Sequence, residues 1–173
     1  MTPHTVLFVP VPGLELASLL GGPGPDDAPP HVTVFGPFVD LAEVSDELLG
    51  ELATIAAAAE PFSYELSDVD AFPGGLAHLV ATPAAPFLKL MNRFGRSFPE
   101  WPPYEGRFAR VVPHLTLGTV PVATARAALA SSLPIRRRAI DVTLFWWDPG
   151  ASRPLAHFPL GVTTRPQGDR TTE

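Results

Sequence analysis

The chain repeats one short phrase, Pro30-His31-Val32-Thr33-Val34 near its beginning and Pro113-His114-Leu115-Thr116-Leu117 two-thirds of the way along. Each copy follows a proline and reads histidine, apolar residue, threonine, apolar residue, which predicts a short β-strand. Because successive side chains of a strand point to opposite faces, the histidine and the threonine share one face and the two apolar residues share the other. We therefore expect each strand to bury its apolar face in a core and to present an imidazole and a hydroxyl on its other face.

The segments around the two phrases predict a mixture of strands and helices. Two turn sequences, Pro73-Gly74-Gly75 and Asp148-Pro149-Gly150, each predict a hairpin, and hairpins favour antiparallel sheets, so the expected fold class is α+β. The helix after the first phrase begins at a cap formed by Asp40 or Ser45. The expected strands are 5–9, 31–35, 62–72, 76–81, 111–120, 135–147 and 155–160, and the expected helices are 45–59, 84–98 and 122–132, with one helical turn near 14–20.

The order of these elements indicates an internal duplication. After each phrase the chain forms a helix and then two strands joined by a turn, so two lobes are expected, each placing one of the repeated strands on a shared central cleft. A length of 173 residues fits a single domain. We expect this bilobal domain to span residues 1–162 and residues 163–173 to form a flexible tail.

Composition narrows the classes of function. Hydrophobic residues make up 46% of the chain and charged residues 17%, which is typical of a globular protein. The net charge of −6 argues against a long nucleic-acid duplex as a partner, because such binders carry a basic surface. A small phosphorylated molecule or the end of an RNA strand remains compatible with this charge. The absence of cysteine excludes disulfides, thiolate nucleophiles and cysteine-based zinc sites.

The apolar segment near the N-terminus does not read as a targeting signal. No lysine or arginine precedes it, and Pro10, Pro12 and Glu15 interrupt it. No window of the sequence approaches the length of an apolar membrane span. The sequence therefore leads us to expect a cytoplasmic monomer that does not bind a membrane.

Two histidines on facing strands suit the chemistry of a phosphodiester. The ordinary pKa of imidazole is about 6.5, so near neutral pH one ring can remove a proton while another donates one. Each role is worth roughly 10²–10⁴-fold in rate. Threonine hydroxyls can donate hydrogen bonds to the non-bridging phosphate oxygens. This scheme needs no metal or other cofactor, and the sequence leaves open which of His31 and His114 is the acid and which the base.

The two phrases, His31-Val32-Thr33-Val34 and His114-Leu115-Thr116-Leu117, resemble the paired motifs of the 2H phosphoesterase superfamily. This superfamily includes the bacterial 2'-5' RNA ligase (LigT) family and cyclic nucleotide phosphodiesterases, and the resemblance extends from the first strand to about Leu160. It implies a bilobal LigT-like fold, with two antiparallel sheets and flanking helices related by a pseudo-two-fold axis. It also implies hydrolysis, independent of metals, of 2',3'-cyclic phosphates or 2'-5' linkages in nucleotides or RNA ends. Carried over by motif, His31 and His114 are the catalytic pair, and Thr33 and Thr116 bind phosphate.

Several aromatic residues could contact a substrate. Tyr104, in the loop before the second phrase, is the strongest such prediction, and Phe35 could line the cleft or equally fill the core. Tryptophans can stack on nucleotide bases. Because Trp146 and Trp147 are neighbours in a strand, at least one of them is expected in the core.

The remaining polar features have less specific interpretations. A run of three arginines, Arg136, Arg137 and Arg138, could steer a phosphate, but side chains alternate along a strand, so at most the first and third act together. A solvated strand edge is the favoured interpretation. His78 lacks the motif and is expected to pack or to form a hydrogen bond within its strand. A metal hydrolase is disfavoured because no further histidine or acidic cluster accompanies either phrase. A non-catalytic protein that binds a nucleotide or phosphorylated metabolite in the same cleft remains the main alternative to an enzyme.

Overall fold

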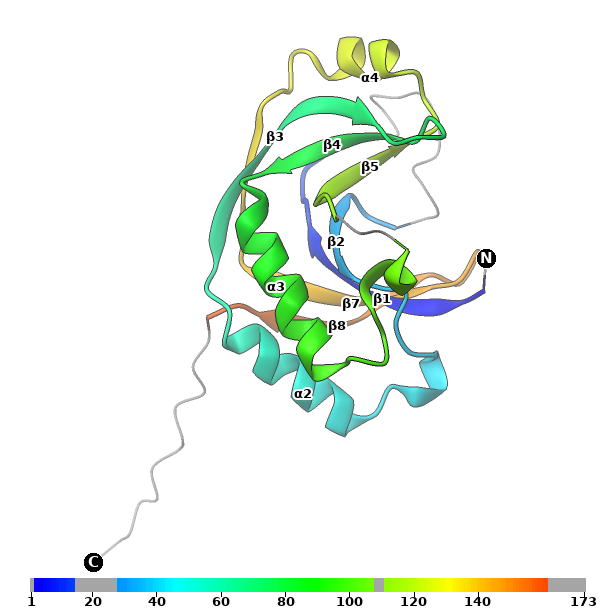
Figure 1. Cartoon of the computed structure of the whole chain (residues 1–173), viewed down its shortest axis with the longest axis vertical. Helices are drawn as coiled ribbons and strands as arrows, with labels where there is room; N and C mark the ends of the chain where they lie inside the picture. Colours follow the sequence, from blue (N-terminus) through cyan, green and yellow to red (C-terminus); the bar gives the residue numbers. More distant parts are fainter. Residues whose placement is uncertain (1, 15–27, 108–110, 162–173) are drawn as a thin grey trace, which may run out of the picture.

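Two four-stranded antiparallel sheets form the body of the protein in the computed structural model, which describes residues 2–14, 28–107 and 111–161 (Figure 1). We call them sheet A, with strand order β2-β1-β7-β8, and sheet B, with order β5-β4-β3-β6. This architecture confirms the expected α+β class. The strands are β1 (His4–Pro10), β2 (His31–Phe35), β3 (Phe62–Ala71), β4 (Ala77–Thr82), β5 (His114–Gly118), β6 (Ile135–Ala139), β7 (Asp141–Trp147) and β8 (Arg153–Pro159).

Helices flank the two sheets. The helix α2 (Asp46–Ala57) packs against β8 of sheet A and against α3 (Ala84–Ser97), which also contacts β2. The short helix α4 (Val122–Leu129) lies over β3 of sheet B (Figure 1). Two 3-10 turns complete the described elements, η2 (Leu41–Glu43) and η3 (Pro103–Gly106), and the second of these contacts β2.

Both residues expected to cap the first helix are used, each by a different element. The Asp40 side chain accepts a hydrogen bond from the backbone N–H of Ala42, at 3.1 Å, and so caps the 3-10 turn. The Ser45 hydroxyl accepts one from the backbone N–H of Leu48, at 3.2 Å, and caps α2. These side chains satisfy N–H groups that have no partner within their own helix.

Alternation along the two repeated strands is visible in their burial. Val32 and Val34 are fully buried, and Leu115 and Leu117 are almost so, in one core that joins both sheets and the helices. The histidines and threonines between them are only half-buried. On the helices, the expected apolar face of α3 is also confirmed, since its four large apolar residues Phe87, Leu90, Met91 and Phe94 are buried.

The two sheets are not the two halves of the chain. Sheet A joins the first two strands to the last two, and sheet B contains the four strands between them. The hairpin β3–β4 that follows the first repeated strand therefore pairs with the second repeated strand. The pseudo-two-fold relation matches β2 with β5 and β1 with β4. As a result, β2 and β5 are both edge strands, and they lie against each other at the centre of the molecule (Figure 1).

The expectation of one long strand from 135 to 147 is wrong. The segment forms two strands in different sheets, with β6 beside β3 and β7 beside β1. The break is at Ile140, whose side chain is 58% exposed and whose carbonyl accepts a hydrogen bond from Leu160 at 2.8 Å. The second repeated strand is also shorter than the range 111–120. The predicted helical turn near 14–20 and the tail from 163 lie almost entirely outside the described residues.

None of the helices in the described ranges combines the length and the apolar composition needed to cross a membrane.

Candidate active site

The approach of β2 to β5 brings the two motif histidines to one place. Cα atoms of the two strands come within 8 Å of each other, and a charge on His114 is close enough to lower the pKa of His31. Thr33 and Thr116 share the strand faces of their histidines, by alternation. The structure thus gathers the four residues of the repeated phrases at the junction of the two sheets.

Both histidines are held by the same hydrogen bond. The Nδ1 atom of His31 lies 2.7 Å from the carbonyl oxygen of Pro29, and that of His114 lies 2.7 Å from the carbonyl oxygen of Val112. A carbonyl only accepts, so Nδ1 carries the hydrogen in each ring. In the neutral form the lone pair is then on Nε2, which makes Nε2 the atom available for proton transfer. His4 makes the same contact with Thr2, and the Nδ1 atom of His78 lies 3.4 Å from the carbonyl oxygen of Leu76, so this local bond is not confined to the motif histidines.

The surroundings favour the neutral form of both rings. Removal from water lowers the pKa of His31 most strongly, the charge of His114 lowers it further, and the bond to Pro29 partly opposes both effects. Burial likewise lowers the pKa of His114 most strongly, the bond to Val112 opposes this, and the neighbouring His78 lowers it again. Both imidazoles of the free protein are therefore mainly unprotonated at neutral pH.

Aromatic rings surround His31. The ring of Phe8 stacks on it at a centroid distance of 4.4 Å and an angle of 25°, and Trp147 meets it edge-on at 6.0 Å. Together with Val6 and Phe145, these two rings form a small apolar cluster separate from the main core. Trp146 is buried, as expected for one member of the tryptophan pair. The structure thus selects Trp147 as the tryptophan beside the motif.

A third histidine lies beside His114. The ring centroids of His78 and His114 are 5.3 Å apart, and Phe72 contacts both, stacking on His78 at 3.9 Å and meeting His114 edge-on at 4.8 Å. His78 is only 2% exposed. Sequence reasoning expected packing within a strand, which the stacking agrees with, but missed the proximity to the motif. That proximity depends on the register of β4 against β5, which no local signal in the sequence fixes.

The two predicted substrate contacts are placed differently. Phe35 is 1% exposed and packs against three other phenylalanines in the core, so it does not face the site. Tyr104 lies in η3, and its backbone N–H donates to the carbonyl of Gly36 at 2.9 Å, which ties this turn to the end of β2. Its φ of 52° is unusual for a bulky residue. Burial raises the pKa of Tyr104 to about 12, so the phenol stays protonated at neutral pH.

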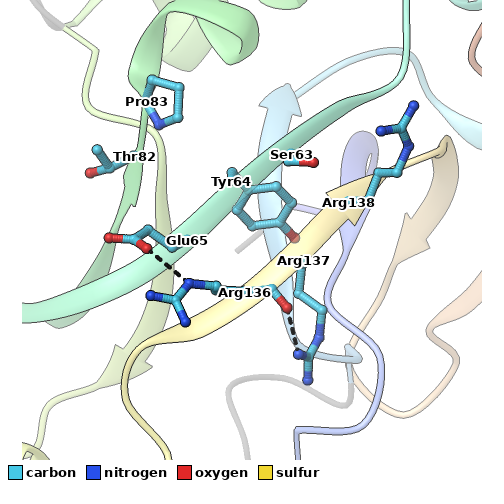
Figure 2. Close-up of a pocket in the computed structure, with 8 residues that line it drawn as sticks. All are labelled: Ser63, Tyr64, Glu65, Thr82, Pro83, Arg136, Arg137 and Arg138. Carbon is cyan, nitrogen blue, oxygen red and sulfur yellow. Dashed lines mark hydrogen bonds and ion pairs between the residues drawn. The ribbon is translucent and has the colours of Figure 1, made fainter.

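The three arginines of β6 line a trough of about 680 Å³ at the edge of sheet B opposite β5 (Figure 2). Arg136 forms an ion pair with Glu65 at 3.5 Å, and Arg137 donates a hydrogen bond to the carbonyl of Arg136 (Figure 2). Arg137 also donates to the carbonyl of Pro12. Arg137 lies opposite the buried Tyr64 in the strand register. Two of the three arginines are thus engaged by the protein itself, and the whole width of the sheet separates the strand from His114.

Metal-ligating side chains do not gather in the described part of the chain: no group of three or more histidine, aspartate or glutamate residues there could hold an ion.

The repeated motif and the paired sheets identify the class of protein. A family model described as the 2'-5' RNA ligase superfamily matches residues 13–151, and the chain belongs to this superfamily of 2H phosphoesterases. The resemblance seen in the two phrases is thereby confirmed.

Solved structures support the fold. The crystal structure of E. coli LigT complexed with 3'-AMP is 19% identical, with a TM-score of 0.58, and the match covers 92% of this chain and 99% of LigT. A structure described as a phosphoesterase is 16% identical, with the same TM-score and coverage. A Thermus thermophilus protein is 16% identical, with a TM-score of 0.55 over 91% of this chain and 98% of its own. A comparison with curated protein sequences found no match.

Proposed function

We propose that this protein is a metal-independent phosphodiesterase that hydrolyses 2',3'-cyclic phosphates or 2'-5' linkages of nucleotides or RNA ends. The observation that carries the proposal is the pair of histidines at the junction of two sheets, each with Nδ1 bonded to a carbonyl and Nε2 free to exchange a proton. Membership of the 2'-5' RNA ligase superfamily supports a phosphodiesterase type of reaction.

The reaction needs one proton acceptor and one proton donor. One neutral Nε2 removes a proton from water, whose oxygen attacks phosphorus. The bond from phosphorus to the departing ribose oxygen breaks, and the second imidazole donates its proton to that oxygen. The hydroxyls of Thr33 and Thr116 donate hydrogen bonds to the non-bridging oxygens, where negative charge increases. The product is a phosphate monoester, and the histidines end with their protonation states exchanged.

The substrate supplies part of the electrostatics. Both histidine pKa values are lowered in the free protein, but a bound phosphate places a negative charge between the rings. A negative charge at this distance favours the protonated form of an imidazole. Substrate binding is therefore accompanied by uptake of one proton, and the histidine that takes it up becomes the proton donor of the reaction.

The aromatic side of the site favours a nucleotide. Trp147 is only partly buried and lies beside His31, and rings of this kind stack on bases with little sequence preference. Tyr104 lies at the other end of β2, where its backbone N–H bonds to Gly36. LigT, which shares the fold, has been crystallised with 3'-AMP, NADP+ and ATP. We propose a single nucleotide or RNA end as the bound group.

An assay with three variants tests the proposal. Purified protein is incubated with nucleoside 2',3'-cyclic phosphates and with 2'-5'-linked dinucleotides in the presence of EDTA. His31→Ala and His114→Ala should each lower kcat by about 10²–10⁴-fold, the range for one acid or base. The matched control is His157→Ala, because His157 is exposed and lies on β8, at the far edge of sheet A from β2.

The outcomes separate an enzyme from a binding protein. Turnover that is insensitive to both motif substitutions would show that the site is elsewhere. Tight binding of 3'-AMP by calorimetry, with no product from either substrate, would support the non-catalytic alternative. Loss of turnover in both variants, with normal activity of His157→Ala, supports the two-histidine mechanism.

A further inference from the structure

The two motif strands have equivalent neighbours in the two sheets, but one position differs in chemistry. In sheet A, Thr33 of β2 lies opposite Phe8 of β1. In sheet B, Thr116 of β5 lies opposite His78 of β4. Residues that face each other across a strand pair point to the same side of the sheet. A phenylalanine beside one motif is therefore replaced, at the equivalent place beside the other motif, by a buried titratable ring.

Strand order places His114 in the middle of a row of three histidines. Moving outward from sheet A, the strands are β2, β5 and β4, which carry His31, His114 and His78 in turn. Each neighbour disfavours a proton on His114, because a second positive charge at this range raises the energy of the first. The lowering of the pKa of His114 by His78 has the same direction.

The surroundings of the two rings differ. Phe72 stacks face-on over His78 at 3.9 Å, whereas His114 meets the same ring at 80°. Asp70 of β3 lies opposite His78 in the strand register. Among the described residues, the charged or titratable groups that lie opposite the pair on neighbouring strands are Asp70 of β3 and His31 of β2.

We propose that His78 is a positioning residue that keeps His114 unprotonated while a phosphate group occupies the site. This proposal rests on the proposed function, because it assigns different protonation states to the two histidines that the reaction requires. With His114 held neutral, the proton drawn in by the substrate resides on His31. His78 acts through its neighbour and itself moves no proton in the reaction.

Nuclear magnetic resonance of the histidine rings tests this directly. The protein is titrated in saturating inorganic phosphate as wild type, as His78→Phe and as His78→Gln. The Phe variant copies the ring found at Phe8, and the Gln variant keeps a polar side chain without a charge. In both variants the titration midpoint of His114 should rise by about one pH unit, with a much smaller change at His31. A His157→Phe variant should change neither midpoint.

A kinetic measurement adds a readout that a purely structural role would not move. The limb of the pH profile of kcat/KM that reports deprotonation of His114 should shift upward by about one pH unit in both variants. The rate should recover as the pH is raised past the new limb. A uniform loss of rate at all pH values, with an unshifted limb, would overturn the proposal.

The titration also separates this proposal from the proposed function. An unchanged His114 midpoint in His78→Gln, or equal shifts at His31 and His114, would overturn the role of His78 whether or not the protein has activity. If His78→Phe does not fold, as judged by circular dichroism, His78→Gln decides. Raised midpoints in a protein that hydrolyses no substrate would support the His78 effect while refuting the enzyme.

Discussion

The lobe that carries His31 and the lobe that carries His114 share a backbone plan and differ in the side chains around each histidine. In both, an edge strand begins with a histidine whose Nδ1 atom bonds to the carbonyl two residues earlier. Phe8 and Trp147 lie against the first ring, whereas Phe72 and His78 lie against the second. The duplicated backbone thus determines the positions of the two imidazoles, and the neighbouring side chains determine the chemical environment of each ring.

This difference matters because a symmetric pair of histidines does not by itself separate donor from acceptor. Proton transfer to one side and from the other requires the two rings to hold protons unequally. We propose that Phe8 and Trp147 beside His31 and a third imidazole beside His114 provide that inequality. The fold therefore supplies the geometry twice, and the unequal chemistry comes from four positions outside the repeated phrases.

A second difference lies at the last residue of each motif strand. β2 ends in Phe35, which is fully surrounded by Phe38, Phe94 and Phe98. β5 ends in Gly118, which has a φ of 97°, and a Cβ atom there would meet nothing within 4 Å. The first strand thus ends in a side chain that is buried in the core. The second strand ends in a left-handed backbone conformation and has no side chain there to bury.

The largest expected effect tests this anchoring. Phe35→Ala removes a buried aromatic ring and should lower the free energy of unfolding by about 3–5 kcal/mol. Urea denaturation followed by circular dichroism measures the change. Because Phe35 does not face the site, the fraction that remains folded should keep its kcat.

The matching change in the other strand gives the contrast. Gly118→Ala creates no cavity and no clash, so its cost comes from the left-handed backbone alone, about 1–2 kcal/mol. Equal losses in Phe35→Ala and Gly118→Ala would show that the two strands are anchored alike, against the comparison.

The next effect concerns the two threonines. Thr33→Val and Thr116→Val keep the shape of the side chain and remove the hydroxyl that we propose as a donor to the phosphate. Loss of one such donor costs roughly 10²–10³-fold in kcat. If the lobes differ only in their histidine neighbours, the two losses should agree within a few-fold in single-turnover assays.

Thr54→Val provides the control for this pair, since Thr54 is exposed on α2 and its hydroxyl bonds to the carbonyl of Gly50. Unchanged kcat in both motif variants would remove the threonines from the phosphate site. A large loss in one variant alone would extend the asymmetry of the lobes to phosphate binding.

Local pattern in the sequence was enough for most of the fold. The alternation in the two phrases predicted which side chains are buried, and the helical spacing of Phe87, Leu90 and Phe94 predicted the inner face of α3. These signals work because burial follows the period of each element. The histidine and threonine positions followed from the same alternation.

Features that depend on pairing between distant strands could not be predicted. No glycine or proline marks the break at Ile140, because the chain there leaves one sheet for the other while both segments keep a strand pattern. The place of His78 beside His114 depends on the register of β4 with β5, which shifts between Ala77 and His78. A shift of one residue would turn His78 to the opposite face.

The smallest effect is a dependence of stability on pH, and it measures how both histidines are held. The pKa values of His31 and His114 are lowered in the native protein, while in the unfolded chain they return to about 6.5. Below pH 6.5 the unfolded chain therefore binds protons that the native site does not. Stability should fall as the pH drops from about 6.5 through the native pKa values, by about 1.4 kcal/mol for each unit by which one of them is lowered.

Substitution tells the two lobes apart in this measurement. Urea denaturation at pH 7 and pH 5 is compared for wild type, His31→Gln and His114→Gln, and each variant should lose part of the difference between the two pH values. His78→Phe should reduce only the part that belongs to His114, because it removes the neighbouring imidazole and leaves the aromatic surroundings of His31 intact. A pH difference that persists in the double variant His31→Gln/His114→Gln would mean that other groups cause it. If His78→Phe changed the pH dependence of stability equally in the presence and absence of His114, its effect would not act through His114. The proposed difference between the two lobes would then be wrong.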